Sequence, residues 1–440
     1  MSRAAGPWTG ILLLGGALLV ATAFGAQALS RWEHGRVVDL ALAQALVYAG
    51  AGWLLLRSEH GAAPSWAPPF ALAGILVLGA LMRLLVLFEP PVSTDVFRYV
   101  WDGRVQGAGM NPYLYIPADA ALAHLRDEVI YPHINRKDYA PTIYPPAAQI
   151  VFFLATRIGE SVTVMKAVMV AFEGLGVLAI LKLLAARGLP ATRILLYVWH
   201  PLPIYEFAGS GHVDAIAIAG LMLAFWAAER RSPLLAGAAL AAGVFAKYFP
   251  MVAGPALWSR WDWRLPAAFA ATAILFYMPY LSAGAALLGF LGGYLDEGGL
   301  ASGSGLYLWS LARLALPLPA SAALYLPLAA ILLALVALRL IFTRQGSGPD
   351  LWGGMVLALV FTVLFSPHHA WYFAWAIPFL CFHPSAAVIY VTGASSSLLK
   401  LGWPPDVAGA SILYGPFAAL LLVEIGLRRT GMKEWRHGRA

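Results

Sequence analysis

Apolar runs of about 20 residues recur from one end of the chain to the other, and a helix of that length crosses the ~30 Å hydrocarbon core of a bilayer. The runs are rich in Ala and Leu. The strands of a membrane β-barrel would instead show short segments of alternating apolar and polar residues. The pattern therefore predicts an all-α fold, a polytopic membrane bundle of about twelve to fourteen transmembrane helices.

The first three spans are expected at 8–29, 37–56 and 69–88. The first run ends in Ala26-Gln27-Ala28, which imitates a signal-peptidase site, but its apolar core is longer than that of a usual signal peptide. We therefore expect this run to be retained as a membrane span. Further spans are expected at about 161–181, 194–209, 211–228, 265–283, 321–341, 351–366, 370–383, 385–399 and 408–427.

No hydrophilic stretch is long enough for a soluble domain of ordinary size, so function must reside in the membrane and its loops. The expected parts are N-terminal transmembrane helices (1–88), an exterior catalytic loop (89–145), a core transmembrane module with partial or re-entrant helices (146–284), a second exterior loop (285–320), and C-terminal transmembrane helices with a basic cytoplasmic tail (321–440). The second loop is rich in Gly and Ser, and both a mobile lid and a passive connector fit that composition.

Two segments, 146–159 and 233–258, do not fit a simple alternation of full spans, because the first is short and the second contains Lys247 and Pro250. If each segment crosses the membrane once as a full span, five basic residues lie on the exterior side. If the first is a partial helix and the second a re-entrant hairpin, the same five lie inside. They are Lys182, Arg187, Arg193, Arg230 and Arg231. The positive-inside rule favours the broken helices, which are tolerated where they line a protein cavity.

The composition excludes a cytosolic globular enzyme, since 60% of the 440 residues are hydrophobic and only 12% are charged. The formal net charge of +7 is compatible with either nucleic acid or anionic lipid as a partner. The last fourteen residues, however, hold five basic side chains against one acid, which places this tail on the cytoplasmic side. We therefore expect contacts with membrane lipids and none with nucleic acid. The single Cys381 lies in an apolar run and indicates neither a disulfide nor a metal site.

The longest polar stretch, 89–144, follows the third span and is the expected place of the chemistry. Within it, Asp95, Arg98 and Asp102 share one face of a short helix. A carboxylate at the boundary of water and hydrocarbon can take a proton from a hydroxyl nucleophile, while guanidinium groups bind phosphate oxygens. A solvated interfacial ion pair is the alternative interpretation of the same residues.

This stretch carries a resemblance to a known superfamily. Thr94-Asp95-Val96-Phe97-Arg98-Tyr99 directly after a span, with Tyr144-Pro145-Pro146 opening the next helix, resembles the GT-C superfamily of polyprenyl-phosphate-sugar glycosyltransferases. The bacterial lipid A aminoarabinose transferases show a similar Asp-x-x-Arg-Tyr arrangement, with Lys-Pro-Pro in place of Tyr-Pro-Pro. The nearer likeness is to polyprenyl-phosphate-mannose-dependent mannosyltransferases, and it extends in outline from about residue 70 to 400. In these enzymes a carboxylate in the first exterior loop is the base, which implies this role for Asp95.

The turn Gly209-Ser210-Gly211-His212-Val213-Asp214 lies between two apolar runs and resembles the turn where the aminoarabinose enzymes place a second aspartate near the first. An ionisable residue at a membrane-embedded turn is a functional candidate, because its burial is costly. A helix cap explains Asp214 equally well. The i, i+2 spacing of His212 and Asp214 does not suit a metal site, and we expect no metal or other cofactor.

Two further places carry candidate chemistry. His368 and His369, followed by Trp371 and Tyr372, lie at a membrane mouth, where they suit a donor phosphate and a sugar ring or, alternatively, an aromatic belt. Lys247, in an apolar hairpin, needs an anion, for which a lipid phosphate, Glu206 and Asp214 are the candidates unless the side chain snorkels to the interface.

The resemblance and the candidate residues together predict an integral membrane glycosyltransferase of the bacterial inner membrane, with its site facing the periplasm. It would move a hexose, mannose by the nearer likeness, from a polyprenyl phosphate donor to a hydroxyl of a lipid- or glycan-linked acceptor, with inversion by direct displacement. The expected catalytic residues are Asp95 and Asp214; the phosphate-binding residues are Arg98, Arg104, Lys247, His368 and His369; the substrate-binding residues are Trp101, Asp102, Tyr113, Tyr144, His212 and Tyr372. A flippase or transporter of lipid-linked sugars is the alternative, and a polymerase or ligase of lipid-linked glycans is a third possibility.

Overall fold

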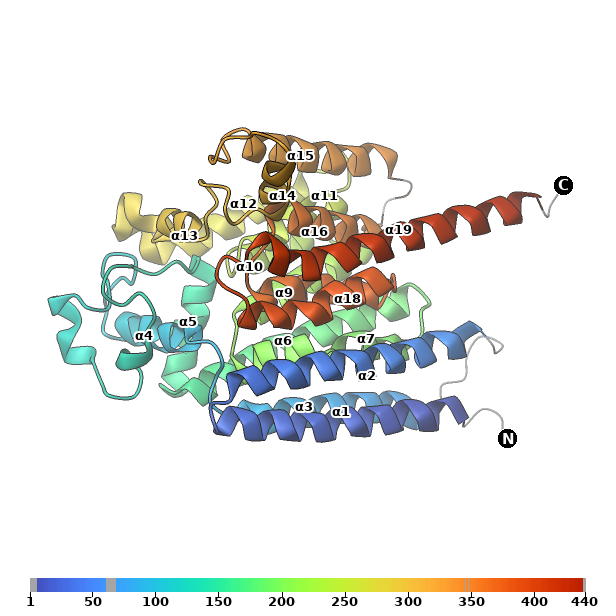
Figure 1. Cartoon of the computed structure of the whole chain (residues 1–440). Coiled ribbons are helices and arrows are strands. Elements are labelled where there is room, and N and C mark those ends of the chain that lie inside the picture. The colour runs from blue at the N-terminus through green and yellow to red at the C-terminus, as the bar shows by residue number, and fades with distance from the viewer. Residues whose placement is uncertain (1–5, 61–68, 345, 347, 438–440) are drawn as a thin grey trace.

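The computed structural model describes residues 6–60, 69–344, 346 and 348–437, and the regular structure within these ranges is helical, which confirms the predicted all-α fold. Its long helices run side by side in one elongated bundle (Figure 1). Within the described ranges, seven helices are long and apolar enough to cross a membrane. They are α1 (Gly6–Ser30), α2 (His34–His60), α3 (Pro69–Leu87), α6 (Val162–Ala186), α12 (Arg264–Tyr277) with its 3-10 continuation η6 (Met278–Leu288), α15 (Tyr325–Thr343) and α19 (Val407–His437).

The other expected spans are shorter or broken. The main short helices are α5 (Pro146–Ile158), α9 (Asp214–Glu229), α10 (Pro233–Val244), α16 (Leu351–Phe365) and α18 (Ala386–Ala394). The expected single span 194–209 is instead four short pieces, η3 (Ala191–Ile194), α7 (Leu195–Val198), α8 (Pro201–Pro203) and the π-helical η4 (Ile204–Gly209). Two prolines within the run cause the break, because a proline lacks the backbone N–H and clashes with the preceding turn.

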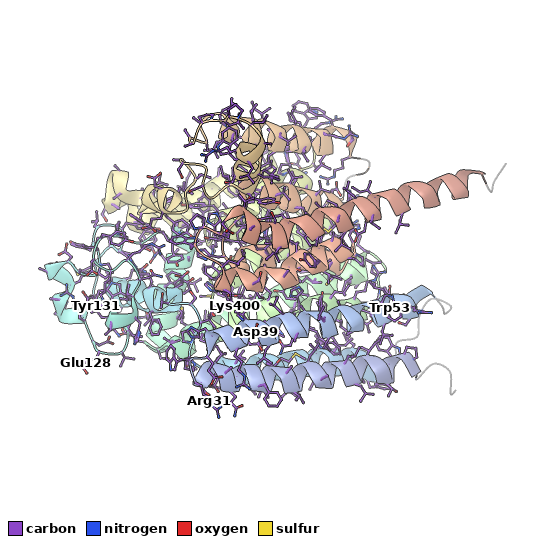
Figure 2. The ribbon with its side chains drawn as sticks, viewed as in Figure 1. Arg31, Asp39, Trp53, Glu128, Tyr131 and Lys400 are labelled. Carbon is purple, nitrogen blue, oxygen red and sulfur yellow. The ribbon has the colours of Figure 1, made fainter. Side chains whose placement is uncertain are left out.

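Ion pairs and the chain termini identify one end of the bundle. Arg193 pairs with Glu59 and Arg187 with Glu229, both at 2.6 Å, on the side where the N-terminus and the C-terminus lie (Figure 1). The opposite end carries the segment after α3, including α4 (Asp95–Gly107), and α13 (Leu291–Glu297) of the second loop. Figure 2 shows this separation, with Glu128 and Tyr131 far from Trp53 along the bundle.

Segment 233–258 forms a hairpin. α10 starts next to the Glu229 end of α9, and the returning α11 (Gly254–Leu257) ends at the same side, where the Ala256 carbonyl accepts a hydrogen bond from Asp350 N at 2.8 Å. The hairpin tip meets the beginning of α5, since Ala147 N donates to Phe245 O at 2.9 Å. The short α5 therefore stays at the α4 end of the bundle. How these two segments lie in the membrane stays a prediction.

Candidate active site

Asp95 begins α4 directly after the third helix, where the helix dipole favours a negative charge. Its Oδ1 accepts a hydrogen bond from Asn135 Nδ2 at 2.8 Å, and its Oδ2 lies 3.9 Å from His212 Nδ1. The side chain is 20% exposed. Burial raises the pKa of Asp95, but His212 and Lys247, with help from Asn135 and His369, outweigh that effect and hold the pKa below its ordinary value. The carboxylate is therefore ionised at neutral pH.

The turn after η4 brings a histidine to this carboxylate. Gly211 has φ +74°, and a Cβ there would lie 2.9 Å from Lys166 Cγ and 3.0 Å from Val96 Cγ2, so the close approach to α6 and α4 requires glycine. His212 is fully buried, and its Nε2 lies 3.2 Å from Glu206 Oε2. The imidazole thus stands between two carboxylates, one from α4 and one from the π-helix, a type of helix often found at functional sites.

Asp214 and Lys247 form a second charged pair beside the first carboxylate. Lys247 Nζ donates to Asp214 Oδ2 at 2.7 Å, so Asp214 is the anion that this lysine of the hairpin tip binds in the structure. Asp214 is fully buried, whereas the lysine side chain is 16% exposed. The ammonium also lies 4.4 Å from the centre of the Tyr372 ring, a cation–π contact.

An aromatic stack joins this cluster to the mouth of α16. The His369 ring stacks on Trp371 at 4.3 Å, and Trp371 stacks on His212 at 3.9 Å. Burial lowers the pKa of His369 to about 3, with Asp95 opposing and Lys247 reinforcing this shift. The imidazole of His369 is therefore neutral at physiological pH. It can donate a hydrogen bond to a phosphate but brings no charge of its own.

The second loop covers the cluster from α13. Tyr294 shares a 2.7 Å hydrogen bond between hydroxyl groups with Tyr372, and Arg136 lies 5.4 Å from the Tyr294 ring. Arg136 in turn pairs with Glu297 at 2.6 Å. The sequence analysis missed Asn135 and Arg136, because no motif spacing marks them within the loop. Their only signal was their position in the same polar stretch as Asp95.

Several other expected site residues have structural partners. Arg98 pairs with Asp102 at 2.8 Å, and Asp102 also accepts hydrogen bonds from Thr142 and Gln149. Arg104 binds two carboxylates, Asp127 at 2.7 Å and Glu160 at 2.8 Å. Their positive charges are thus already neutralised by these carboxylates.

The remaining aromatic and histidine candidates are divided between the loop core and the edge of the cluster. Trp101 is fully buried, with its ring 5.6 Å from that of Tyr131. The Tyr113 hydroxyl donates to the Tyr144 carbonyl at 2.8 Å. Burial raises the pKa of Tyr144, and Asp95 raises it further, so this ring lies within the field of the carboxylate. His368 points away from the cluster, with Nε2 2.6 Å from the Gly305 carbonyl oxygen.

The structure thus brings together side chains from α4, the turn before α9, the hairpin tip and the mouth of α16. The residues of this cluster, which we call the Asp95 cluster, are Asp95, Asn135, His212, Asp214, Lys247, His369, Trp371 and Tyr372. Among the described residues, no group of three or more His, Cys, Asp or Glu suits a metal ion. That the chain needs no metal stays a prediction.

Residues 4–262 match the model of the MptA_B family, described as alpha-(1→6)-mannopyranosyltransferase, N-terminal domain. The match covers more than half of the chain. The chain belongs to this family. It is therefore a membrane glycosyltransferase that transfers mannose, as predicted, and the flippase alternative is set aside. No curated protein and no solved structure matches the chain. The matched region contains Asp95, His212, Asp214 and Lys247, whereas His369 and Tyr372 lie beyond it.

Proposed function

We propose that this mannosyltransferase uses a polyprenyl phosphate as the mannose donor and joins the sugar in α-(1→6) linkage to the primary hydroxyl of a sugar acceptor, with Asp95 as the general base. The observation that carries this proposal is the Asp95 cluster, which combines an accessible, ionised carboxylate with an ammonium group. Asp95 is the most accessible of the three clustered carboxylates, at 20% exposure against 6% for Glu206 and none for Asp214.

The proposed step is a direct displacement. The acceptor oxygen attacks the anomeric carbon, its proton passes to Asp95, and the bond between that carbon and the phosphate oxygen breaks. The phosphate leaves with the electron pair as an anion. A single displacement inverts the anomeric carbon, so an α-linked product implies a β-linked donor. Asn135 holds the carboxylate in position by its hydrogen bond, His212 lies beside it, and Asp214 holds the lysine.

The leaving phosphate is stabilised by Lys247 and Arg136, with a hydrogen bond from neutral His369. Arg98 and Arg104 are left out of this role, because their hydrogen bonds go to residues outside the Asp95 cluster, whereas Lys247 belongs to the cluster and Arg136 is adjacent to Asn135. The anion also raises the pKa of His369 when it binds, since a nearby negative charge favours the protonated imidazole. Donor binding is therefore expected to take up a proton at low pH.

An apolar groove between α3 and α6 supports a lipid-linked donor. It has a volume of about 300 Å³ and is lined chiefly by leucine and valine side chains, among them Leu84, which is half exposed, and Leu87. At its floor, Arg83 is neutralised by Glu173 at 2.6 Å. The groove reaches the end of α3, and the chain continues from there to Asp95. A prenyl chain in this groove directs its phosphate toward the Asp95 cluster.

Purified enzyme, radiolabelled polyprenyl-phosphate-mannose and a saccharide acceptor test the proposal. We expect Asp95→Asn to lower kcat by about 10²- to 10⁴-fold, the range for loss of a general base, while the donor still binds. Asp127→Asn is the matched control, because this carboxylate lies in the same loop but pairs with Arg104. Retained turnover of Asp95→Asn excludes it as the base. Release of polyprenyl pyrophosphate instead of monophosphate would indicate a polymerase or ligase.

We also propose that the Asp95 cluster faces the exterior of a bacterial inner membrane. Val129 and Trp261 are 69% and 79% exposed and lie at opposite ends of the bundle. A cysteine at position 129 should react with a membrane-impermeant maleimide added to intact spheroplasts, whereas one at position 261 should react only after the membrane is opened. The reverse pattern contradicts this orientation.

A further inference from the structure

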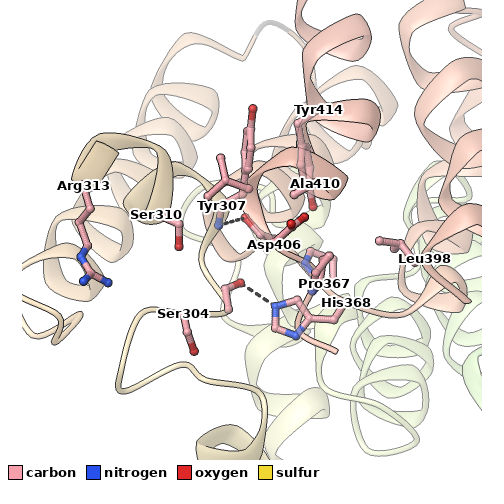
Figure 3. A pocket seen from close by; sticks show the side chains of 14 residues that line it. Ser304, Tyr307, Ser310, Arg313, Pro367, His368, Leu398, Asp406, Ala410 and Tyr414 are labelled. Atoms are coloured by element: carbon pink, nitrogen blue, oxygen red, sulfur yellow. Dashed lines mark hydrogen bonds between the residues drawn. The ribbon is translucent and has the colours of Figure 1, made fainter. Parts of the chain in front are cut away.

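A second hollow lies beyond the region matched by the family model. It has a volume of about 250 Å³ and is enclosed by α14 (Tyr307–Ala315), the turn after α16 and the beginning of α19 (Figure 3). We call it the α14–α19 pocket. It is smaller than the ~300–1,000 Å³ typical of sites for drug-sized ligands, a size that suits a single sugar ring.

The lining of the α14–α19 pocket combines aromatic faces with hydroxyl and carboxylate groups. Tyr307 stacks on Tyr414 with ring centres 4.9 Å apart. The side chains of Ser310 and Asp406 line the same space, with Arg313 near its edge (Figure 3). A pyranose ring matches such a surface, because its C–H face packs on aromatic rings while its hydroxyls bond to polar side chains.

Tyr414 is part of the pocket wall through its ring. The residue is 6% exposed, and its buried hydroxyl lies close to Ser366. The ring is therefore the part of Tyr414 that a ligand in the pocket can contact.

The turn between α16 and η7 (Ala370–Ala376) connects this pocket to the Asp95 cluster. Ser366 has φ +44°, a conformation that a non-glycine residue adopts at a cost, and its Oγ accepts a hydrogen bond from Tyr307 N at 3.1 Å. His368 then lines the pocket, while the adjacent His369 stacks in the cluster. Trp403 contacts the His369 ring at 5.5 Å, and Asp406 three residues later lines the pocket. Two neighbouring segments therefore form walls of both sites.

We propose that the α14–α19 pocket binds a sugar ring of the acceptor saccharide, next to the ring whose hydroxyl reaches Asp95. This inference rests on the proposed function and extends it to acceptor recognition. An apolar prenyl chain would take the Asp406 carboxylate and the serine hydroxyls out of water without offering them hydrogen bonds, and the negative charge of Asp406 also disfavours a phosphate. A neutral saccharide avoids both penalties.

Two variants of the full-length enzyme test this pocket. Ser310→Phe fills it, and Asp406→Asn removes one negative charge while keeping an oxygen to accept the 2.7 Å hydrogen bond from Gly409 N that caps α19. Asp350→Asn is the matched control, because Asp350 caps α16 by the same contact, to Gly353 N at 2.8 Å, and does not line the pocket.

With α-1,6-mannobiose as acceptor, we expect Ser310→Phe to raise the acceptor KM about ten-fold or more and Asp406→Asn to raise it by about three- to ten-fold, the effect of weakening one hydrogen bond to a charged group. The donor KM should stay unchanged in both variants. Asp350→Asn should leave both KM values at the wild-type level. Direct calorimetric titration of mannobiose into the detergent-solubilised enzyme should show the same order of affinities.

The outcomes separate this inference from the proposed function. If the wild-type enzyme accepts no mannose from polyprenyl phosphate, the donor proposal fails, and the titration with mannobiose still tests the pocket. If both variants keep the wild-type acceptor KM and affinity, the pocket proposal is overturned while the catalytic proposal stands. A rise in the donor KM alone, or loss of binding to phosphatidylglycerol vesicles without loss of mannobiose binding, also overturns it.

Discussion

Helix α4 carries two carboxylates whose surroundings differ in kind. Asp102 is 1% exposed and accepts hydrogen bonds from Arg98, Thr142 and Gln149, so its bonding capacity is largely used within the loop. Asp95 is 20% exposed and receives one side-chain hydrogen bond, from Asn135. A satisfied, buried carboxylate stabilises a fold, whereas an accessible one with free acceptor sites is available to a substrate. The two residues share one face of a short helix, and their environments assign them different roles.

Replacing each of these two carboxylates by its amide should give the largest change in kcat or in stability. Asp95→Asn should lower kcat by about 10²- to 10⁴-fold with little change in thermal stability. Asp102→Asn should do the reverse, because it leaves the buried Arg98 guanidinium without its counter-charge, at a cost of about 3–5 kcal/mol in the free energy of unfolding. Its remaining folded fraction should turn over near the wild-type rate. Thermal melts and single-turnover assays on both proteins would check this, and a fast Asp95→Asn enzyme would refute the distinction.

Breaking the ion pair between Lys247 and Asp214 should lower both the stability and kcat. Lys247→Met leaves Asp214 buried without a cation, which should cost about 3–5 kcal/mol in stability. We also expect at least a roughly hundred-fold loss of kcat, because the leaving phosphate loses its ammonium. The double variant Lys247→Met/Asp214→Asn should regain most of the stability and none of the activity. If it regains activity as well, the lysine is purely structural.

Lys400 offers the matched control for that experiment. It pairs with Asp39 at 2.5 Å, but the two side chains are 40% and 66% exposed (Figure 2). Exposed pairs contribute little, so Lys400→Met should change stability by about 1 kcal/mol or less and leave turnover intact.

Filling the groove between α3 and α6 should have a smaller effect, and that effect should be on the KM for the donor. Gly174 lines this groove, and a Cβ there would meet no atom within 4 Å, so Gly174→Leu fills the space without a clash. We expect a rise of about ten-fold in KM for a long-chain donor and a smaller rise for a short-chain analogue, because less apolar surface is buried. Gly16→Leu on α1, where a Cβ likewise meets no atom within 4 Å, is the control and should change neither value. Equal KM values for Gly174→Leu and the wild type would remove the groove from the donor path.

The pH dependence of stability separates the titratable groups of the cluster. Because Asp95 has a lowered pKa in the folded protein, its contribution to stability is complete above the ordinary value of 3.8 and is lost as the pH falls through the folded value. His369, with a pKa of about 3 against an ordinary 6.5, binds fewer protons when folded, so stability should fall as the pH drops from 6.5 toward 3. His369→Gln should flatten the melting temperature over that window, and an unchanged slope would contradict the neutral state of this imidazole.

The hydrophobic pattern was sufficient for the fold class, because each helix must present an apolar surface to the bilayer whatever its neighbours are. It was insufficient at the broken spans. The run at 194–209 has the apolar character of a crossing helix, yet Pro201 and Pro203 divide it, and His200 is accommodated by a 2.9 Å contact with Thr392 far along the chain.

Candidate residues were found wherever a charge or imidazole interrupted an apolar run, since burial of such a group is costly without a partner. That reasoning selected His212, Asp214 and Lys247. Asp95 was found in the longest polar stretch and through its resemblance, and His369 at a membrane mouth. The structure brings all five into one cluster. The sequence did not separate these five from Arg98 and Arg104, because the neutralising carboxylates come mostly from distant positions. Asn135 and Arg136 were missed for the same reason, as they owe their place to the path of the loop.

The sequence alone was therefore enough to establish a helical membrane protein, because apolar runs respond to the surrounding solvent. It was also enough to find the short motif that begins α4, because the residues of that motif are neighbours in the chain. The folded chain was needed to show which charges are neutralised, which hairpin turns back and which segments build the α14–α19 pocket. These properties depend on contacts between residues 33 to 192 positions apart, which a local sequence pattern does not reveal.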